Sequence, residues 1–128
     1  ALADQYSALE PLPGIFVDGK FTLGENIGDL GGVNAAYDGL QIHLKEKGNP
    51  GLIDGYTPDQ RFFISWATIW RSKMRDEAIK NQVKTDPHSP GMYRAYVPLQ
   101  NVEAFYKAFN ILPHNGMYLP FEKRVKIW

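Results

Sequence analysis

A long run of apolar residues at helical spacing, closed by a strong stop signal, is the feature that most restricts how this chain can fold. Its apolar positions recur at three- and four-residue steps: Ile27, Leu30, Val33, Tyr37, Leu40 and Leu44. This periodicity is typical of one buried face of an α-helix. Gly48-Asn49-Pro50-Gly51 follows, and such a sequence ends a helix. We therefore predict a helix over about residues 24–47 and a mainly α fold.

Two further helices are predicted downstream. Thr57-Pro58-Asp59-Gln60 has the form of an N-cap with proline at the first helical position and a capping box. The helix that follows has a wide aromatic face, formed by Phe62, Phe63, Trp66, Ile69, Trp70 and Met74. Residues 71–84 are expected to form the charged, solvated end of the same helix. Asn101 is the predicted N-cap of a third helix, with these residues facing inward: Val102, Phe105, Tyr106 and Phe109.

The remaining segments are predicted to be mostly irregular. Residues 1–14 are expected to be an irregular lead-in, and residues 15–23 a short β-hairpin turning at Asp18-Gly19. Residues 85–100 hold three prolines and a glycine and predict a rigid loop. The tail from residue 113 is expected to be irregular, with its last apolar residues docked on the body: Val125, Ile127 and Trp128.

Composition excludes several classes of function. The 128 residues suffice for a single domain spanning 1–128. Lys+Arg and Asp+Glu number 14 each, so no basic surface for nucleic acid is expected. Cysteine is absent, which excludes disulfides and thiolate metal sites. The chain begins at Ala1 and not at methionine, so we expect a processed product or an excised piece.

The segment T-L-G-E-N-I-G-D-L-G-G, residues 22–32, carries the strongest functional signal. Glu25 and Asp29 lie one helical turn apart, where like charges repel and therefore call for a shared cation or separate partners. One interpretation is structural: Glu25 completes a capping box with Thr22. The glycines, however, weaken a helix and usually mark close approach of another backbone. The carboxylates and glycines together indicate one half of a site.

This segment resembles the part of the neprilysin family of zinc metallopeptidases that supplies the third zinc ligand. Three further segments resemble the family's C-terminal region, in the same order, and so does the terminal Trp128: F-F-I-S-W-A-T-I-W, K-T-D-P-H-S-P-G-M-Y-R and L-Q-N-V-E-A-F-Y-K-A-F-N. The resemblance covers about residue 15 to the end. It implies the C-terminal helical part of a thermolysin-like (gluzincin) catalytic domain.

The resemblance also implies roles for individual residues. Glu25 becomes the carboxylate ligand of a Zn²⁺ ion, and Asp29 the residue that holds a zinc-binding histidine by hydrogen bond. His88 becomes the donor that stabilises the oxyanion of the tetrahedral intermediate, and Arg94 the group that binds a substrate carbonyl. Ile69 and Trp70 would line the neighbouring hydrophobic pocket, although both also suit a core. His43 and His114 match nothing and are expected at the surface.

The family's H-E-x-x-H helix, with two zinc histidines and the general-base glutamate, is not found in this sequence. We therefore expect the C-terminal fragment of a larger metalloendopeptidase, inactive alone and without tightly bound zinc. Its partners would be peptide substrates, cleaved on the amino side of hydrophobic residues, and the missing N-terminal part of the same polypeptide. The exposed glycine face would favour self-association of the fragment.

Further expectations follow from the same resemblance. Arg71, Ile111 and Val125 stand where animal members carry cysteines, which indicates a bacterial member. Most such enzymes face outside the cytoplasm, so an extracytoplasmic location is expected. Two alternatives stay open: a non-catalytic helical binding or assembly module derived from this family, and a purely structural helical domain whose carboxylates act as caps.

Overall fold

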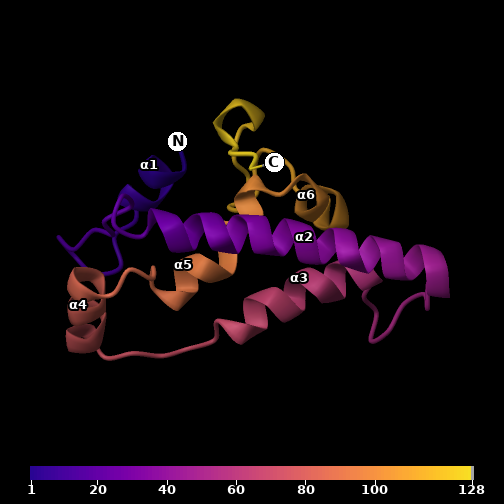
Figure 1. Cartoon of the computed structure of the whole chain (residues 1–128), viewed down its shortest axis with the longest axis horizontal. Coiled ribbons are helices and arrows are strands. Elements are labelled where there is room, and N and C mark those ends of the chain that lie inside the picture. The colour runs from indigo at the N-terminus through magenta and orange to yellow at the C-terminus, as the bar shows by residue number, and fades with distance from the viewer. Residues whose placement is uncertain (128) are drawn as a thin grey trace.

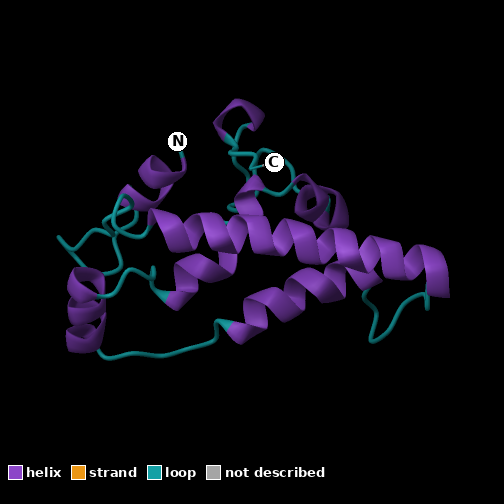
Figure 2. Ribbon diagram, in the orientation of Figure 1, coloured by secondary structure: helices purple, strands orange, loops and turns teal. Residues whose placement is uncertain are grey.

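The computed structural model describes residues 1–127 and shows a mainly helical fold (Figures 1 and 2). Within these residues there is no strand, only the isolated bridges Leu12–Ile15 and Ile53–Tyr56. The α-helices are α1 (Leu2–Ser7), α2 (Leu23–Lys47), α3 (Pro58–Ile69), α4 (Asp76–Thr85), α5 (Gly91–Tyr96) and α6 (Glu103–Phe109), and two 3₁₀ turns, η1 (Leu99–Asn101) and η2 (Phe121–Lys123), complete the set.

The long helix α2 is the spine of the molecule and confirms the predicted helix. Figure 1 shows it running across most of the molecule, with α3 and α5 along one side and α6 on the other. Leu30 and Val33 of its apolar stripe are fully buried. The helix ends at Gly48, whose positive φ of 90° suits glycine. No helix of residues 1–127 is long and apolar enough to cross a membrane.

Helix α3 begins as predicted and supplies the centre of the core. The Thr57 side chain accepts a hydrogen bond from the Gln60 amide, and the Gln60 side chain accepts one from the Thr57 amide. Phe63 is buried and packs on Tyr37 of α2 and Phe105 of α6. The helix ends at Ile69, however. The charged stretch after it forms a loop and then the separate helix α4, which has no buried residue.

The expectations for the first 23 residues were wrong in two respects. Residues 2–7 form α1, and the hairpin predicted at residues 15–23 is absent. The Asp18 carboxylate instead accepts hydrogen bonds from the amides of Lys20 and Phe21, which closes a tight turn leading into α2. Gly19 is needed for space, since a Cβ there would collide with the Ala3 carbonyl oxygen of α1. A tertiary contact, and not a hairpin turn, therefore explains this glycine.

The capping box proposed at the start of α2 is also not formed. Thr22 occupies the N-cap position, but its side chain makes no capping bond to the helix backbone. The Thr22 hydroxyl donates to the Asp18 carbonyl and accepts from the Asn26 side chain. Glu25 is therefore left free to interact elsewhere.

The proline-rich segment and Asn101 also differ from expectation. The segment 85–100 contains α5, with Pro90 at its N-cap and Pro98 beyond its end. The N-cap of α6 is Val102. Asn101 is buried in η1, where its side chain bonds Gln5 of α1 and the amide of Val125.

The tail docks on the body as predicted. Val125 and Ile127 pack partly buried against the core. Trp128, predicted to dock with them, lies outside the described residues.

Candidate active site

Glu25 and His88 meet although 63 residues of chain separate them. The first turn of α2 presents Glu25, and the short loop before α5 presents His88. The Glu25 Oε2 atom lies 3.1 Å from the His88 Nε2 atom. Both side chains are nearly half exposed, 46% and 41% respectively, so the pair is accessible to a ligand.

Asp86 fixes the orientation of the His88 ring. Its Oδ1 atom accepts from the His88 backbone amide at 2.9 Å and lies 2.7 Å from the ring Nδ1 atom. These hydrogen bonds, led by the one from the backbone amide, hold the pKa of Asp86 below its ordinary value. The Nε2 atom is thereby left to face Glu25. Asp86 was missed at the sequence level, although an aspartate two residues before a histidine in a proline-bounded loop is a recognisable turn signal.

Asp29 pairs with Arg94 across the interface between α2 and α5. The guanidinium Nε and Nη2 atoms lie 2.7 Å from Oδ2 and Oδ1 respectively, a two-pronged arrangement. Asp29 is 8% and Arg94 15% exposed. The hydrogen bond to Asp29 raises the pKa of Arg94 above its ordinary value. Glu25 and Asp29 thus have separate partners, one of the two arrangements that their spacing calls for.

The tryptophan next to this ion pair supports Arg94. The Arg94 Cζ atom stacks 4.0 Å from the centre of the Trp70 ring, an arrangement that favours a cation. The indole of Trp66 also holds this region, since its Nε1 atom donates to the Arg94 carbonyl at 3.2 Å. Trp66 was predicted only as a core residue. Ile69, the last residue of α3, is 66% exposed.

Three glycines of α2 lie on an open helix face. Gly24, Gly28 and Gly32 are exposed, and a Cβ built on any of them meets no atom within 4 Å. Neighbouring segments of this chain therefore do not explain the glycines, in contrast to Gly19. We call the face carrying these three residues the glycine face.

The donor set fits one part of a zinc site. Glu25 offers an accessible carboxylate, the oxygen ligand of a hydrolytic His₂Glu site. No group of three or more His, Asp or Glu side chains that could hold a metal occurs among residues 1–127. His43 and His114 are exposed, as predicted. Glu25 is therefore suited to supply one carboxylate ligand.

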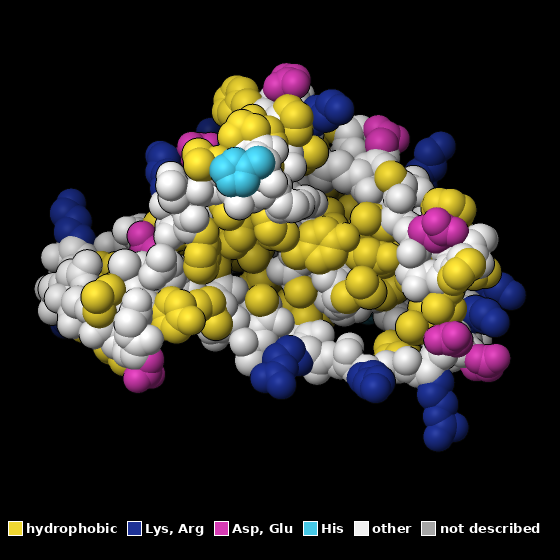
Figure 3. Space-filling model, turned by 180° about the vertical axis from the view of Figure 1, so that it is seen from behind, with side chains coloured by type: hydrophobic (Ala, Val, Ile, Leu, Met, Phe, Trp, Pro, Cys, Tyr) yellow, Lys and Arg dark blue, Asp and Glu magenta, His cyan; other side chains and the backbone are white. Residues whose placement is uncertain are grey.

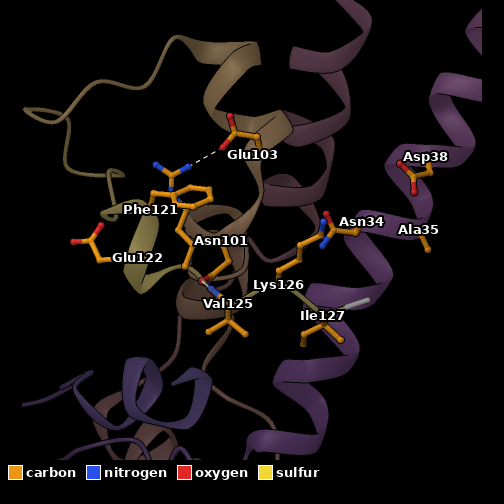
Figure 4. Close-up of a pocket in the computed structure, with 11 residues that line it drawn as sticks. Asn34, Ala35, Asp38, Asn101, Glu103, Phe121, Glu122, Val125, Lys126 and Ile127 are labelled. Atoms are coloured by element: carbon orange, nitrogen blue, oxygen red, sulfur yellow. Dashed lines mark hydrogen bonds and ion pairs between the residues drawn. The ribbon is translucent and has the colours of Figure 1, made fainter.

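A cavity of about 860 Å³ lies apart from these residues (Figure 4). Asn34, Ala35 and Asp38 of α2 form one wall, and Asn101, Glu103 and six residues of the tail form the rest: Phe121, Glu122, Arg124, Val125, Lys126 and Ile127. None of the candidate-site residues described above lines it. Seen from behind, hydrophobic side chains also gather in a hollow in the middle of the molecule (Figure 3).

Comparison with known proteins shows which family this chain is similar to. The model of peptidase family M13 matches residues 1–125. Human neprilysin is 38% identical over 117 residues, covering 90% of this chain and 15% of neprilysin. Neutral endopeptidase of Lactobacillus helveticus is 37% identical over 112 residues, covering 88% of this chain and 16% of the relative.

Solved structures agree in fold. A Mycobacterium tuberculosis zinc metalloprotease in complex with an inhibitor matches with a TM-score of 0.93 and 43% identity, covering 99% of this chain and 20% of that one. The chain thus spans between 15% and 20% of the length of these relatives. On the match of the family model and of these relatives, the chain belongs to peptidase family M13, the neprilysin family.

Proposed function

We propose that this chain is the C-terminal part of the catalytic domain of a zinc metalloendopeptidase that hydrolyses oligopeptides. The observation that carries the proposal is the meeting of Glu25, His88 and the Asp29–Arg94 pair on neighbouring parts of α2, α5 and the loop between α4 and α5. Family membership supports the reaction class. The two zinc histidines and the general-base glutamate would come from a part of the polypeptide outside this chain.

In this proposal Glu25 supplies the carboxylate ligand of Zn²⁺. The ion, when bound, polarises the substrate carbonyl and lowers the pKa of a bound water. Asp29 acts beside it: Arg94 occupies one position on each of its oxygens, and a carboxylate accepts about four hydrogen bonds in all. Asp29 can therefore still accept a hydrogen bond from a zinc-binding histidine and orient that ring.

His88 is suited to stabilise an oxyanion. Asp86 binds the ring at Nδ1, and this fixes the plane of the imidazole before substrate arrives. The Nε2 atom lies 3.1 Å from the Glu25 Oε2 atom, so when it carries a proton it presents a donor at the edge of the site where Glu25 would hold the metal. A donor that is already oriented stabilises developing charge more than a mobile one, because no reorganisation accompanies the reaction.

Arg94 is suited to hold the peptide backbone. Two of its N–H groups bind Asp29, so three of the five remain for a carbonyl oxygen. Asp29 on one edge and the Trp70 ring on one face keep the guanidinium fixed. The exposed Ile69 next to Trp70 offers apolar surface for a hydrophobic side chain of the substrate. Cleavage on the amino side of such a residue stays a prediction from the family resemblance.

The test of this function uses the complete peptidase. Glu25→Ala is expected to abolish both stoichiometric zinc and peptide hydrolysis. Glu46→Ala makes the same change at an exposed position near the other end of α2 and is expected to leave both intact. Full zinc content in the Glu25→Ala protein, measured by elemental analysis, would refute the ligand assignment.

An assembly role is the second candidate, favoured by the glycine face. Three exposed glycines along one helix allow another backbone to approach closely. In the complete peptidase the rest of the polypeptide would cover this face. The chain alone is expected to bind no stoichiometric zinc and to self-associate, and a monodisperse monomer in light scattering would contradict the second expectation. The bacterial origin and the extracytoplasmic location stay predictions.

A further inference from the structure

A chain of buried polar side chains connects the start of α2 to the loop that carries His88. The Ser89 hydroxyl donates to the Asn26 Oδ1 atom at 2.9 Å, and the Asn26 Nδ2 atom donates to the Thr22 hydroxyl at 2.9 Å. Thr22 in turn donates to the Asp18 carbonyl at 3.0 Å. Ser89 and Asn26 are 1% exposed and Thr22 is 3% exposed.

The direction of every hydrogen bond in this network of four residues is determined. The Thr22 hydroxyl has one proton, which it gives to the Asp18 carbonyl, so it can only accept from Asn26. The Asn26 amide must then direct its oxygen at Ser89. A buried polar network in which these groups all have partners admits one arrangement and is rigid.

The sequence places this network directly beside the candidate site. Asn26 follows Glu25, and Ser89 follows His88. The contact between Glu25 and His88 is itself nearly half exposed on both sides, and contacts between such exposed polar side chains contribute little to stability. That pair is too weak to fix its own geometry. The buried bond between the neighbouring residues is the stronger constraint on the distance between α2 and the loop.

We propose that Asn26 and Ser89 are positioning residues that hold the His88 imidazole in register with the Glu25 carboxylate. The proposal rests on the proposed function, since it assigns the pair to the geometry of that peptidase site. Neither side chain touches substrate, because both are buried. They act through their neighbours: the Ser89–Asn26 bond sets where the loop lies against the first turn of α2.

The first experiment measures steady-state hydrolysis by the complete peptidase. Ser89→Ala removes the donor and leaves the Asn26 oxygen unpaired. It is expected to lower kcat by about 10- to 100-fold, because a displacement of about 1 Å in a site costs on that order. KM and zinc content should change little. Ser89→Thr retains the hydroxyl and should restore most of the lost kcat.

A matched control separates positioning from general stability. Asn101 is another buried asparagine, with hydrogen bonds to α1, to the tail and to the Val97 carbonyl, and none to a residue of the candidate site. Asn101→Ala should lower the melting temperature at least as much as Ser89→Ala does, yet leave kcat unchanged. If Ser89→Ala lowers the melting temperature and keeps the wild-type kcat, the two residues are merely structural and the proposal is overturned.

A second measurement also uses the complete peptidase but does not need hydrolysis. Hydrogen exchange of the Asp86, His88 and Ser89 amides should become faster in Ser89→Ala but not in Asn101→Ala; unchanged exchange would overturn the proposal. Ser89→Cys, which is close in size and a weak donor, gives the same comparison if the alanine variant fails to fold. Failure of the proposed function would look different: the wild-type peptidase would lack zinc and activity, while the exchange result still decides the positioning role.

Discussion

Replacing Gly28 by alanine is expected to stabilise this chain, whereas the same substitution at Gly19 is expected to destabilise it. Gly28 lies in the interior of α2, is exposed, and has no atom within 4 Å of a built Cβ. Glycine in a helix interior is about 1 kcal/mol less favourable than alanine. Gly28→Ala should therefore raise the free energy of unfolding by about 1 kcal/mol, or the melting temperature by roughly 3–5 °C.

Gly19 presents the opposite case. A Cβ there would collide with the Ala3 carbonyl oxygen and lie 2.7 Å and 2.8 Å from the Oγ and N atoms of Ser7. The backbone of α1 cannot yield as a flexible side chain would, and overpacking of this kind costs about 1–3 kcal/mol. The Gly19 amide would also move from the Ser7 hydroxyl that it now bonds at 3.2 Å. The two variants should therefore differ by about 2–4 kcal/mol.

The assay is reversible unfolding in urea, followed by circular dichroism for the wild-type chain and both variants. A stable Gly19→Ala protein would refute the packing argument, and a destabilised Gly28→Ala protein would show that the glycine face is already in contact. In the complete peptidase Gly28→Ala should instead lower the stability, because the rest of the polypeptide is proposed to cover the glycine face there. A Gly28→Ala peptidase with an unchanged melting temperature and activity would contradict that cover.

Three further predictions concern side chains. Tyr6 is fully buried and its hydroxyl has no hydrogen-bond partner among residues 1–127. Tyr6→Phe should therefore leave the thermal stability unchanged or raise it. A loss of more than about 1 kcal/mol in the free energy of unfolding would show that the hydroxyl has a partner. Asp29→Asn leaves Arg94 buried without its counter-charge and should cost about 3 kcal/mol in urea unfolding; a loss under 1 kcal/mol would contradict this. Asp86 has a lowered pKa in the folded chain, so it contributes stability above its ordinary pKa of 3.8, and this stability is lost as the pH falls through the folded pKa. Asp86→Asn should flatten that acid part of the curve of stability against pH; an unchanged curve would argue against the hydrogen bonds from His88.

Local signals were predicted correctly from the sequence. The capping box of Thr57 and Gln60 involves residues close in the sequence. The apolar stripe of α2 is likewise visible in the spacing of residues within that one segment. The errors arose where a distant segment decides the outcome. Gly19 is small because α1 lies against it, and Asn101 bonds α1 and the tail instead of capping α6.

The candidate site could likewise be predicted only in part. Resemblance supplied Glu25, Asp29, His88 and Arg94, but the pairing of Asp29 with Arg94 joins positions 65 residues apart and has no local signature. The role of Asp86 could have been proposed from its spacing to the histidine.

The bonds of Gln5 also bear on how the chain acquires its structure. The Gln5 side chain bonds Asn101, 96 residues away, and the Lys123 carbonyl, 118 residues away. Closing so long a loop carries a large entropic cost that only later contacts offset. Synthesis proceeds from the N-terminus, so α1 can pack on α2 early, whereas the bonds of Gln5 form only after Asn101 and Lys123 have been made. A nascent protein arrested just short of Lys123 would keep α1 packed on α2 yet lack the bond that ties Gln5 to the tail.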